Sequence, residues 1–427
     1  MIKKLSLLLV AITALVWLNP VTAQNTPYTI IANPGENASR EIRINWHTNL
    51  GSGDSHIIYT KRSDKNWKKA ISARAEQEVC TVFDSIYSKK PNGDNFYEDA
   101  RFIRNTIALQ GLKEDTEYKY KFSANKNTEI HYFKTAPKSD KWTMGIISDM
   151  HVYTPLSNRQ KVAMEMIQQL EKQNKKPFDM MLHVGDIAAW GGSYSFWPNL
   201  YADSTFSKYV WAGVNGNHDN MTRLNAQSNK FFRNVNNNPM NGYPGEIGVS
   251  YHFTYGDALF VMLNNEAMKS DEELAKAQDW TRDVIKSNPA KYIIFLSHYQ
   301  WFMGNDGKGS QYSRWKKLFD EYGVDLAISG NNHIYVRTNA LYGDQETDGS
   351  KGTVYIQTPS SDNERGRALD EQLYNKDLIK FRWSEGSKTV GALIMKANKK
   401  GLTLTLYNRD GNAIDHVSVK SKSKKLR

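Results

Sequence analysis

Cysteine is almost absent from this chain of 427 residues. With Cys80 alone, no disulfide can form within the chain, so its domains depend on hydrophobic cores for their stability. Cys80 lies in the apolar run 79–83, which is typical of a buried structural thiol. Internal repeats and low-complexity tracts are absent as well, which excludes a repeat architecture. A chain of this length is sufficient for two or three domains.

Long apolar runs are also scarce. The only marked one, Leu5–Leu18, is short for a membrane span, follows two lysines and precedes the small residues Val21–Ala23. This is the pattern of a secretory signal peptide over residues 1–23, and an uncleaved membrane anchor is the alternative. The residue directly after the expected cleavage site is Gln24 and not a cysteine, which argues against a bacterial lipoprotein. We therefore expect an exported protein, periplasmic or secreted, without stable membrane insertion.

The charge balance is basic, with a formal net charge of +11. Such a balance favours anionic partners, namely phosphate esters, nucleic acid or a membrane face, although solvated surface lysines explain it equally simply. Residues 421–427 form a basic tail that we expect to be frayed. No stripe of basic and aromatic residues is evident, so no nucleic-acid partner is expected. The sequence leaves the oligomeric state open.

Two regions differ in their hydrophobic periodicity. Residues 24–138 show period-two alternation, clearest over 42–46 and 118–122, which predicts an all-β module with one buried face on each sheet. The polar stretch 84–101 within it is predicted to be a long loop. Residues 142–420 alternate between strand and helix patterns, which predicts a layered α/β domain.

Within the second region, apolar spacing predicts helices around 163–170 and 315–322. A hairpin is predicted over 250–264, with Gly256-Asp257 at its turn. Residues 388–420 return to strand patterns, and we interpret them as closing strands of the same domain. A separate small β-domain is the alternative.

Short polar segments follow five predicted buried strands of this region. In α/β sheets, ligands gather just past the carboxyl ends of the strands, so we expect these side chains to form one cluster. A mixture of carboxylate and imidazole suits Zn, Mn or Fe better than Ca or Mg. Each residue alone has an ordinary structural explanation, and it is the shared strand context that favours a metal site. The candidates are Asp149, His151, Asp186, Asn217, His218, Asp219, His298 and His333.

The order and spacing of the segments Asp149-x-His151, Gly185-Asp186 and Gly216–Asp219, followed by the late histidines, resemble the calcineurin-like metallophosphoesterase superfamily. Residues 112–118 resemble the turn and tyrosine corner of a fibronectin type III sandwich. Together the two regions are similar to purple acid phosphatases. This resemblance implies an N-terminal β-sandwich followed by a metallophosphoesterase domain in which a β-sandwich is flanked by helices.

The resemblance also implies a site with two divalent metal ions, Fe, Mn or Zn, that share Asp186 as a bridging ligand. It implies hydrolysis of a small phosphate monoester or diester by a metal-bound hydroxide, as in an acid phosphatase. His218 would contact the phosphate or protonate the leaving alkoxide, and Asp219 would orient the His218 ring and raise its pKa. The first ion would be held by Asp149, His151, Asp186 and His333, and the second by Asp186, Asn217 and His298.

Three positions depart from the family pattern. Asn331 stands where an imidazole would complete the second metal site, and an amide oxygen is a weaker ligand for Zn or Fe. The second site is therefore expected to be weak, selective for a harder ion such as Mn, or empty. Ala189 replaces the tyrosine of the purple enzymes, so no purple colour is expected. Residues 299–310 contain none of the substrate-binding histidines, and Lys308 or Trp301 are the only candidate substitutes.

Two rival functions remain. One is a surface protein with a degenerate metal site that binds phosphorylated glycans or lipids without cleaving them, which Asn331 favours. The other, ranked lower, is an exported nuclease. Aromatic residues over 190–197 would either line a substrate pocket or pack their loop onto the domain, and we favour packing. Arg365 and Arg367 would either meet phosphate or remain solvated.

Overall fold

The computed structural model describes residues 26–89, 95–123, 129–152, 158–220, 230–264, 268, 270–302, 310–369, 375–420 and 422. The predicted signal peptide and Lys308 lie outside these ranges. Within them, no helix combines the length and the apolar character needed to cross a membrane.

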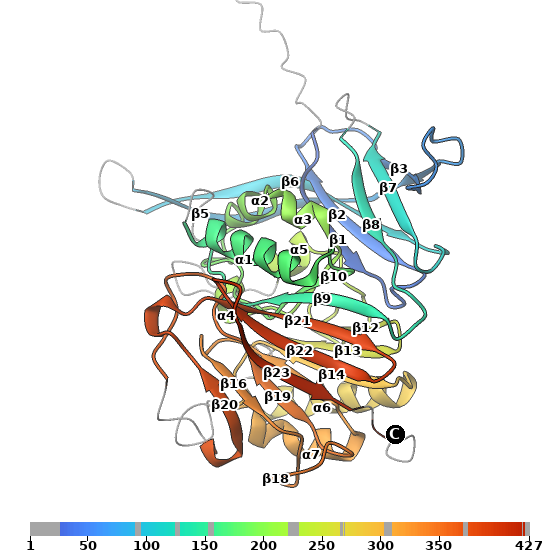
Figure 1. Ribbon diagram of the computed structural model, residues 1–427. Helices are drawn as coiled ribbons and strands as arrows, with labels where there is room; N and C mark the ends of the chain where they lie inside the picture. Colours follow the sequence, from blue (N-terminus) through green and yellow to red (C-terminus); the bar gives the residue numbers. More distant parts are fainter. Residues whose placement is uncertain are drawn as a thin grey trace, which may run out of the picture.

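The N-terminal region is a sandwich of two four-stranded antiparallel sheets, with strand orders β1-β2-β6-β5 and β4-β3-β7-β8 (Figure 1). Alternate residues such as Trp46 and Tyr120 are buried between the sheets. The Tyr118 hydroxyl accepts a hydrogen bond of 2.9 Å from the backbone nitrogen of Lys113, which completes the expected tyrosine corner. The strands are β1 (Tyr28–Pro34), β2 (Ile42–Thr48), β3 (His56–Lys61), β4 (Ile71–Arg74), β5 (Glu76–Lys89), β6 (Asn95–Leu109), β7 (Glu117–Phe122) and β8 (His131–Lys134).

The prediction of a long loop over 84–101 was wrong, because residues 84–89 continue β5 and residues 95–101 belong to β6, while 90–94 lie outside the described residues. The two strands pair in antiparallel register from Glu76–Thr106 to Ser85–Tyr97 and again at Lys89–Asn95. Backbone pairing of this kind satisfies the amide and carbonyl groups whatever the polarity of the side chains. A polar hairpin therefore forms without the hydrophobic alternation that reveals a strand in a sequence. Cys80, on β5, is buried as expected.

The second region is built on two further sheets, ordered β11-β10-β9-β21-β22-β23 and β12-β13-β14-β15-β19-β16-β20. The strands of the first are β9 (Trp142–Ile147), β10 (Met180–His183), β11 (Trp211–Gly213), β21 (Gly391–Asn398), β22 (Gly401–Asn408) and β23 (Ala413–Val419). Those of the second are β12 (Tyr251–Tyr255), β13 (Ala258–Leu263), β14 (Tyr292–Ser297), β15 (Leu326–Ser329), β16 (Tyr335–Thr338), β19 (Val354–Gln357) and β20 (Ile379–Trp383). A small hairpin joins β17 (Leu341–Tyr342) and β18 (Gln345–Glu346).

Helices cover the outer faces of both sheets, so the domain has four layers (Figure 1). Strand β14 shows the reason: Ile294 and Leu296 pack between the sheets, whereas Ile293 and Phe295 pack under the outer helices. Helix α1 lies against β9 and β21 of the first sheet, α2 and α3 contact β1 of the sandwich, and α6 and α7 lie against the second sheet. The helices are α1 (Asn158–Asn174), α2 (Phe196–Tyr201), α3 (Ser204–Lys208), α4 (Asn217–Asn220), α5 (Lys230–Val235), α6 (Asp271–Ser287) and α7 (Tyr312–Tyr322).

The closing strands belong to this domain, as predicted. β21 pairs antiparallel with β9 and thereby joins β22 and β23 to the first sheet, so the alternative of a separate β-domain is excluded. The hairpin of β12 and β13 and the helices α1 and α7 also lie where the sequence predicted them. The expectation of a frayed tail was wrong at Lys422, whose buried ammonium group donates a 3.0 Å hydrogen bond to the Gly323 carbonyl oxygen.

The sandwich packs directly on the second domain through a buried asparagine, Asn237. Its backbone nitrogen donates to Asn33 Oδ1 at 2.8 Å. Its amide group donates to the carbonyl oxygens of Ile44 at 3.2 Å and Ile107 at 3.1 Å. Its own carbonyl accepts from Arg43 Nε at 3.1 Å. One residue of the second domain thus links three strands of the sandwich, β1 through its backbone nitrogen and β2 and β6 through its side chain.

We expect Asn237→Ala to destabilise the protein by about 2–3 kcal/mol, because it removes two buried hydrogen bonds and leaves polar groups without partners. Thermal or chemical unfolding would measure the loss. Asn398→Ala, which removes one exposed hydrogen bond from the Lys400 backbone nitrogen, is the matched control and should change stability by less than about 0.5 kcal/mol. Equal stability of the two variants would show that the Asn237 contacts do not hold the domains together.

Candidate metal centre

The polar residues that follow β9, β10, β14 and β15 meet at one end of the two sheets. Asp186 Oδ2 lies 3.3 Å from His151 Nε2 and 3.1 Å from His298 Nε2. Asp149 Oδ1 lies 3.3 Å from His333 Nε2. All five residues are buried. The structure thus brings together side chains that are up to 184 positions apart in the sequence.

Four histidines at this end are oriented in the same way, each by a backbone carbonyl. A carbonyl oxygen only accepts hydrogen bonds, so in the neutral ring each Nδ1 carries the proton and each Nε2 is left with a lone pair. Backbone partners of this kind fix the tautomer of metal-binding imidazoles. The Nδ1 partners are the oxygens of Asp149 for His151 (3.0 Å), Ala189 for His218 (3.0 Å), Val184 for His298 (2.7 Å) and Arg365 for His333 (2.6 Å).

The backbone at this end adopts conformations that side chains normally avoid. Five of the eleven non-glycine residues with positive φ in the described ranges lie here. Each such residue costs of the order of 1–3 kcal/mol and persists only where the surrounding structure enforces it, as functional sites often do. The five are Asp149 (52°), His151 (45°), Asp186 (54°), Asn331 (66°) and His333 (59°).

Two glycines permit the close approach of the ligand side chains. A Cβ atom on Gly185, where φ is 92°, would lie 2.6 Å from His298 Nδ1. A Cβ atom on Gly216 would lie 2.2 Å from Asp186 Oδ1. Both distances are shorter than any tolerated contact. The glycines of the Gly-Asp and Gly-Asn segments are therefore needed to leave space for the neighbouring ligands.

The chemistry of the donor set fits divalent cations. His151 Nε2, Asp186 Oδ2 and Asn217 Oδ1 are buried and make no hydrogen bond to any other described residue. Burying polar atoms in that state is unfavourable unless another group satisfies them, and coordination to a cation would do so. Donor atoms within 4.8 Å of one another form three overlapping groups, namely Asp149 with His151 and His333, Asp149 with Asp186 and His298, and His151 with Asp186 and His218. Asp186 belongs to two of them.

Neighbouring carboxylates raise the pKa values of two histidines in this cluster. Burial lowers the pKa of His298, but the Asp186 carboxylate outweighs it and raises that pKa to about 10. Burial likewise lowers the pKa of His151, and Asp186 together with Asp362 raises it to about 9. The buried carboxylates therefore make this end of the sheets attractive to positive charge. A bound metal would compete with protons for these rings, since only a neutral imidazole is a ligand.

Asp219 does not orient the His218 ring, so that prediction was wrong. The His218 ring is held by the Ala189 carbonyl oxygen instead, and burial lowers the pKa of His218 by more than the Asp186 carboxylate raises it. Asp219 lies under the turn that carries Asp186, where a carboxylate can satisfy several backbone nitrogens at once. Its hydrogen bonds come from the backbone nitrogens of Asp186 (2.8 Å), Gly216 (2.9 Å) and Ala188 (3.0 Å).

Comparison with protein families identifies both regions. Residues 143–335 match the family model for calcineurin-like phosphoesterases, and residues 27–135 match the purple acid phosphatase N-terminal domain. This chain carries a calcineurin-like phosphoesterase domain. A purple acid phosphatase N-terminal domain precedes it, which confirms the resemblance and the fold inferred from the sequence.

Individual relatives are distant. Probable purple acid phosphatase 20 of Arabidopsis thaliana is 22% identical over 306 residues, which cover 68% of this chain and 68% of that protein. Probable inactive purple acid phosphatase 1 of the same plant is 25% identical over 205 residues, covering 43% of this chain and 33% of that protein. A solved structure of purple acid phosphatase PPD1 from yellow lupin (Lupinus luteus) seeds has a TM-score of 0.69 at 16% identity, covering 94% of this chain and 76% of that chain, and shows the shared fold.

The sequence did not reveal two residues that contact candidate metal ligands. Asp362 Oδ2 lies 3.5 Å from His151 Nδ1. Ser360 Oγ donates a 2.9 Å hydrogen bond to the Asp149 carbonyl oxygen. The only signal was a polar run shortly after the strand at 354–357, the same strand-end context that revealed the ligands. Arg365 contributes its carbonyl oxygen to His333, whereas Arg367 is exposed.

Asn331 contacts the site mainly through its backbone. Its backbone nitrogen lies 3.2 Å from both carboxylate oxygens of Asp149, and its side-chain amide donates a hydrogen bond to Gln300 Oε1. Asn331 therefore orients Asp149, and its amide nitrogen is already engaged. Among the aromatic residues after Asp186, Tyr194 and Trp197 are buried, as the packing interpretation predicted, and Trp190 lies 6.3 Å from His218 between ring centroids.

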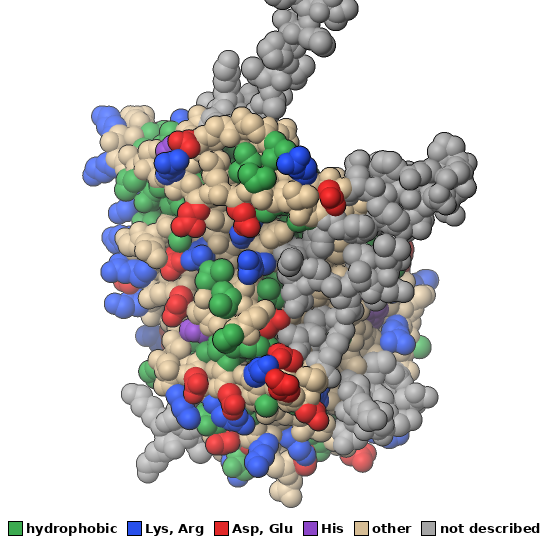
Figure 2. All heavy atoms as spheres, turned by 180° about the vertical axis from the view of Figure 1, so that it is seen from behind, with side chains coloured by type: hydrophobic (Ala, Val, Ile, Leu, Met, Phe, Trp, Pro, Cys, Tyr) green, Lys and Arg blue, Asp and Glu red, His purple; other side chains and the backbone are tan. Residues whose placement is uncertain are grey.

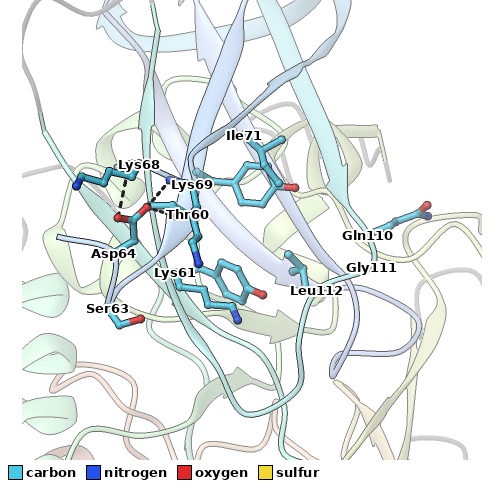
Figure 3. A pocket seen from close by; sticks show the side chains of 12 residues that line it. Thr60, Lys61, Ser63, Asp64, Lys68, Lys69, Ile71, Gln110, Gly111 and Leu112 are labelled. Carbon is cyan, nitrogen blue, oxygen red and sulfur yellow. Dashed lines mark hydrogen bonds between the residues drawn. The ribbon is translucent and has the colours of Figure 1, made fainter. Parts of the chain in front are cut away.

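A separate cavity of about 600 Å³ lies on the N-terminal sandwich (Figure 3). The Asp64 carboxylate closes the loop beside it by accepting hydrogen bonds from the backbone nitrogens of Lys68 at 3.2 Å and Lys69 at 2.8 Å. None of the residues that line this cavity belongs to the candidate metal centre. The cavity is lined by Tyr59, Thr60, Lys61, Ser63, Asp64, Lys68, Lys69, Ile71, Gln110, Gly111, Leu112 and Tyr118.

Proposed function

We propose that this protein is an exported metal-dependent phosphoesterase that hydrolyses small phosphate monoesters or diesters with two divalent ions, Fe, Mn or Zn. The observation that supports it most is the position of Asp186. Its buried Oδ2 atom lies 3.3 Å from His151 Nε2 and 3.1 Å from His298 Nε2 and makes no hydrogen bond to a described residue. A carboxylate placed in this way is suited to bridging two cations.

Most of the candidate residues would bind metal, and His218 would transfer a proton. Bound cations would supply positive charge for the phosphoryl oxygens and a nucleophilic water. The Ala189 carbonyl holds His218 Nδ1–H and leaves His218 Nε2 free to carry a proton. As water attacks phosphorus and the ester P–O bond breaks, His218 gives that proton to the leaving oxygen. One ion would be held by Asp149, His151, Asp186 and His333, and the other by Asp186, Asn217 and His298.

Export is supported by the signal-peptide pattern of residues 1–23. A small phosphorylated substrate is preferred to a nucleic acid because basic and acidic side chains are mixed in the part of the surface that faces the viewer in Figure 2. In the central part of the face shown in Figure 2, Lys and Arg side chains alternate with Asp and Glu side chains. A nuclease would need an extended basic surface along the strand.

Turnover of two nitrophenyl substrates tests the proposal. Protein stripped with a chelator should not cleave 4-nitrophenyl phosphate or bis(4-nitrophenyl) phosphate. Adding Mn, Zn or Fe should restore cleavage of at least one of them. Absence of turnover with every metal, in protein that remains folded, would refute the enzyme and favour the binding-protein alternative.

That alternative rests on Asn331 and on a relative named as a probable inactive phosphatase. We expect Asn331→His to bind the second ion more tightly, because imidazole is a better ligand for Zn than an amide oxygen. The gain will be small if the new ring finds no partner for its other nitrogen. Zinc titration of both proteins, with elemental analysis, measures it. Two equally tight ions in the wild type would show that Asn331 does not weaken the site.

A further inference from the structure

The segment 189–195 holds both the ring and the backbone of His218. The Ala189 carbonyl oxygen accepts the 3.0 Å hydrogen bond from His218 Nδ1. The Gly191 backbone nitrogen donates to the His218 carbonyl oxygen at 2.9 Å. A Cβ atom on Gly191 would lie 2.3 Å from the Asp219 carbonyl oxygen, so this contact is as close as two backbones allow. The position of His218 therefore depends on the position of this segment.

The N-terminal sandwich holds the other end of the same segment. Tyr194 is buried, and its hydroxyl lies 2.6 Å from His47 Nδ1 on β2. Its ring stacks on Phe102 of β6, with centroids 4.3 Å apart and planes 9° from parallel. Next to it, the Ser195 backbone nitrogen donates to Asp84 Oδ1 of β5 at 3.1 Å. Three strands of the sandwich thus fix a segment that belongs to the phosphoesterase domain.

The His47 ring can play only one role in this contact. His47 Nε2 lies 2.9 Å from the Asn234 carbonyl oxygen, so Nε2 carries the proton and Nδ1 accepts from the Tyr194 hydroxyl. Burial lowers the pKa of His47 to about 3 and keeps the ring neutral. The hydrogen bond between the domains therefore runs in one direction, from the Tyr194 hydroxyl to His47 Nδ1.

We propose that Tyr194 is a positioning residue through which the N-terminal sandwich sets the place of the His218 ring and so controls proton transfer to the leaving group. The proposal rests on the proposed function. In this proposal the sandwich positions the proton donor His218, although it contributes none of the candidate metal ligands. Small displacements of a group that reacts in the transition state have large effects on rate, because the required geometry is narrow.

Tyr194→Phe tests the proposal, because it keeps the stacked ring and removes only the hydroxyl. The matched control is Tyr201→Phe, which removes another buried hydroxyl, bonded to Asn236 Oδ1 at 3.2 Å, without touching segment 189–195. The full chain, loaded with metal, is assayed with 4-nitrophenyl phosphate and with glycerol phosphate, whose alkoxide needs a proton to leave. Hydrogen exchange of residues 189–197, followed by mass spectrometry, reports the segment without any turnover.

Tyr194→Phe should lower turnover of glycerol phosphate by about 10-fold or more and that of 4-nitrophenyl phosphate by less than about 3-fold, with metal content unchanged. Exchange over 189–197 should be faster than in the wild type. When His218 is already replaced by alanine, adding Tyr194→Phe should not lower the turnover of glycerol phosphate any further. Tyr201→Phe should show neither the split between substrates nor the faster exchange.

An equal loss on both substrates, or the same behaviour in both tyrosine variants, would overturn the positioning role. If the wild type cleaves neither substrate with any metal, the proposed function fails. The exchange measurement then still decides whether the Tyr194 hydroxyl holds the segment, since unchanged exchange in Tyr194→Phe would exclude it.

Discussion

Asp186→Ala is expected to lose both metal and activity. Its carboxylate faces His151 and His298 through Oδ2 and accepts a 2.7 Å hydrogen bond from the His218 backbone nitrogen through Oδ1. Removing a bridging ligand should lower kcat/KM by about 1,000-fold or more, since both cations and the turn that carries His218 lose a partner. Steady-state kinetics and elemental analysis of the same preparation measure the two losses.

Two further variants separate the loss of metal from a general loss of folding. Asp186→Asn preserves the shape and the Oδ1 acceptor, so it should remain folded while binding metal poorly. Asp203→Ala removes a carboxylate that caps α3 through Thr205, away from the site, and should retain activity within about 2-fold. Activity of Asp186→Ala close to the wild-type value would contradict a shared ligand at this position.

His218→Ala should keep its metal and lose turnover by about 100- to 10,000-fold, the range typical of a general acid. The loss should be smaller for 4-nitrophenyl phosphate than for an alkyl phosphate, because nitrophenolate leaves without a proton. Rates on both substrates, together with metal content, test it. His416→Ala, which removes an exposed imidazole from β23, is the control and should leave both rates unchanged.

An equal loss on the two substrates would contradict the acid role of His218 and would indicate electrostatic contact with the phosphate instead. A loss of metal in His218→Ala would place His218 among the ligands. That outcome has a structural basis, since His218 forms a group of donor atoms with His151 and Asp186 within 4.8 Å.

The sequence predicted the parts of this molecule that depend on local patterns. Buried strands appear as apolar runs, and the residues that follow them, such as Asp186 and His298, were placed together because strand ends meet at one edge. Hairpin β5–β6 escaped prediction because its strands are polar and are defined by backbone pairing. Helix α7 was recovered because its apolar face has the helical period.

The details that failed depend on where a side chain points after a tight turn. Asp219 stands next to His218, and adjacency suggested that it orients the ring. The turn with positive φ at Asp186 instead brings the backbone nitrogens of Asp186 and Ala188 over the Asp219 carboxylate, and Gly216 adds a third. The contact of His47 with Tyr194 joins residues 147 positions apart in different domains, and no periodicity in either segment reveals it.

Metal stoichiometry tests the central claim most directly. After the chelated protein is dialysed to equilibrium against saturating Mn and the Mn of the dialysate is subtracted, elemental analysis should find two ions per chain in the wild type and at most one in Asp186→Asn. Fewer than two ions in the wild type at saturating Mn would contradict a two-ion centre. Equal metal content in the wild type and Asp186→Asn would contradict the shared role of Asp186.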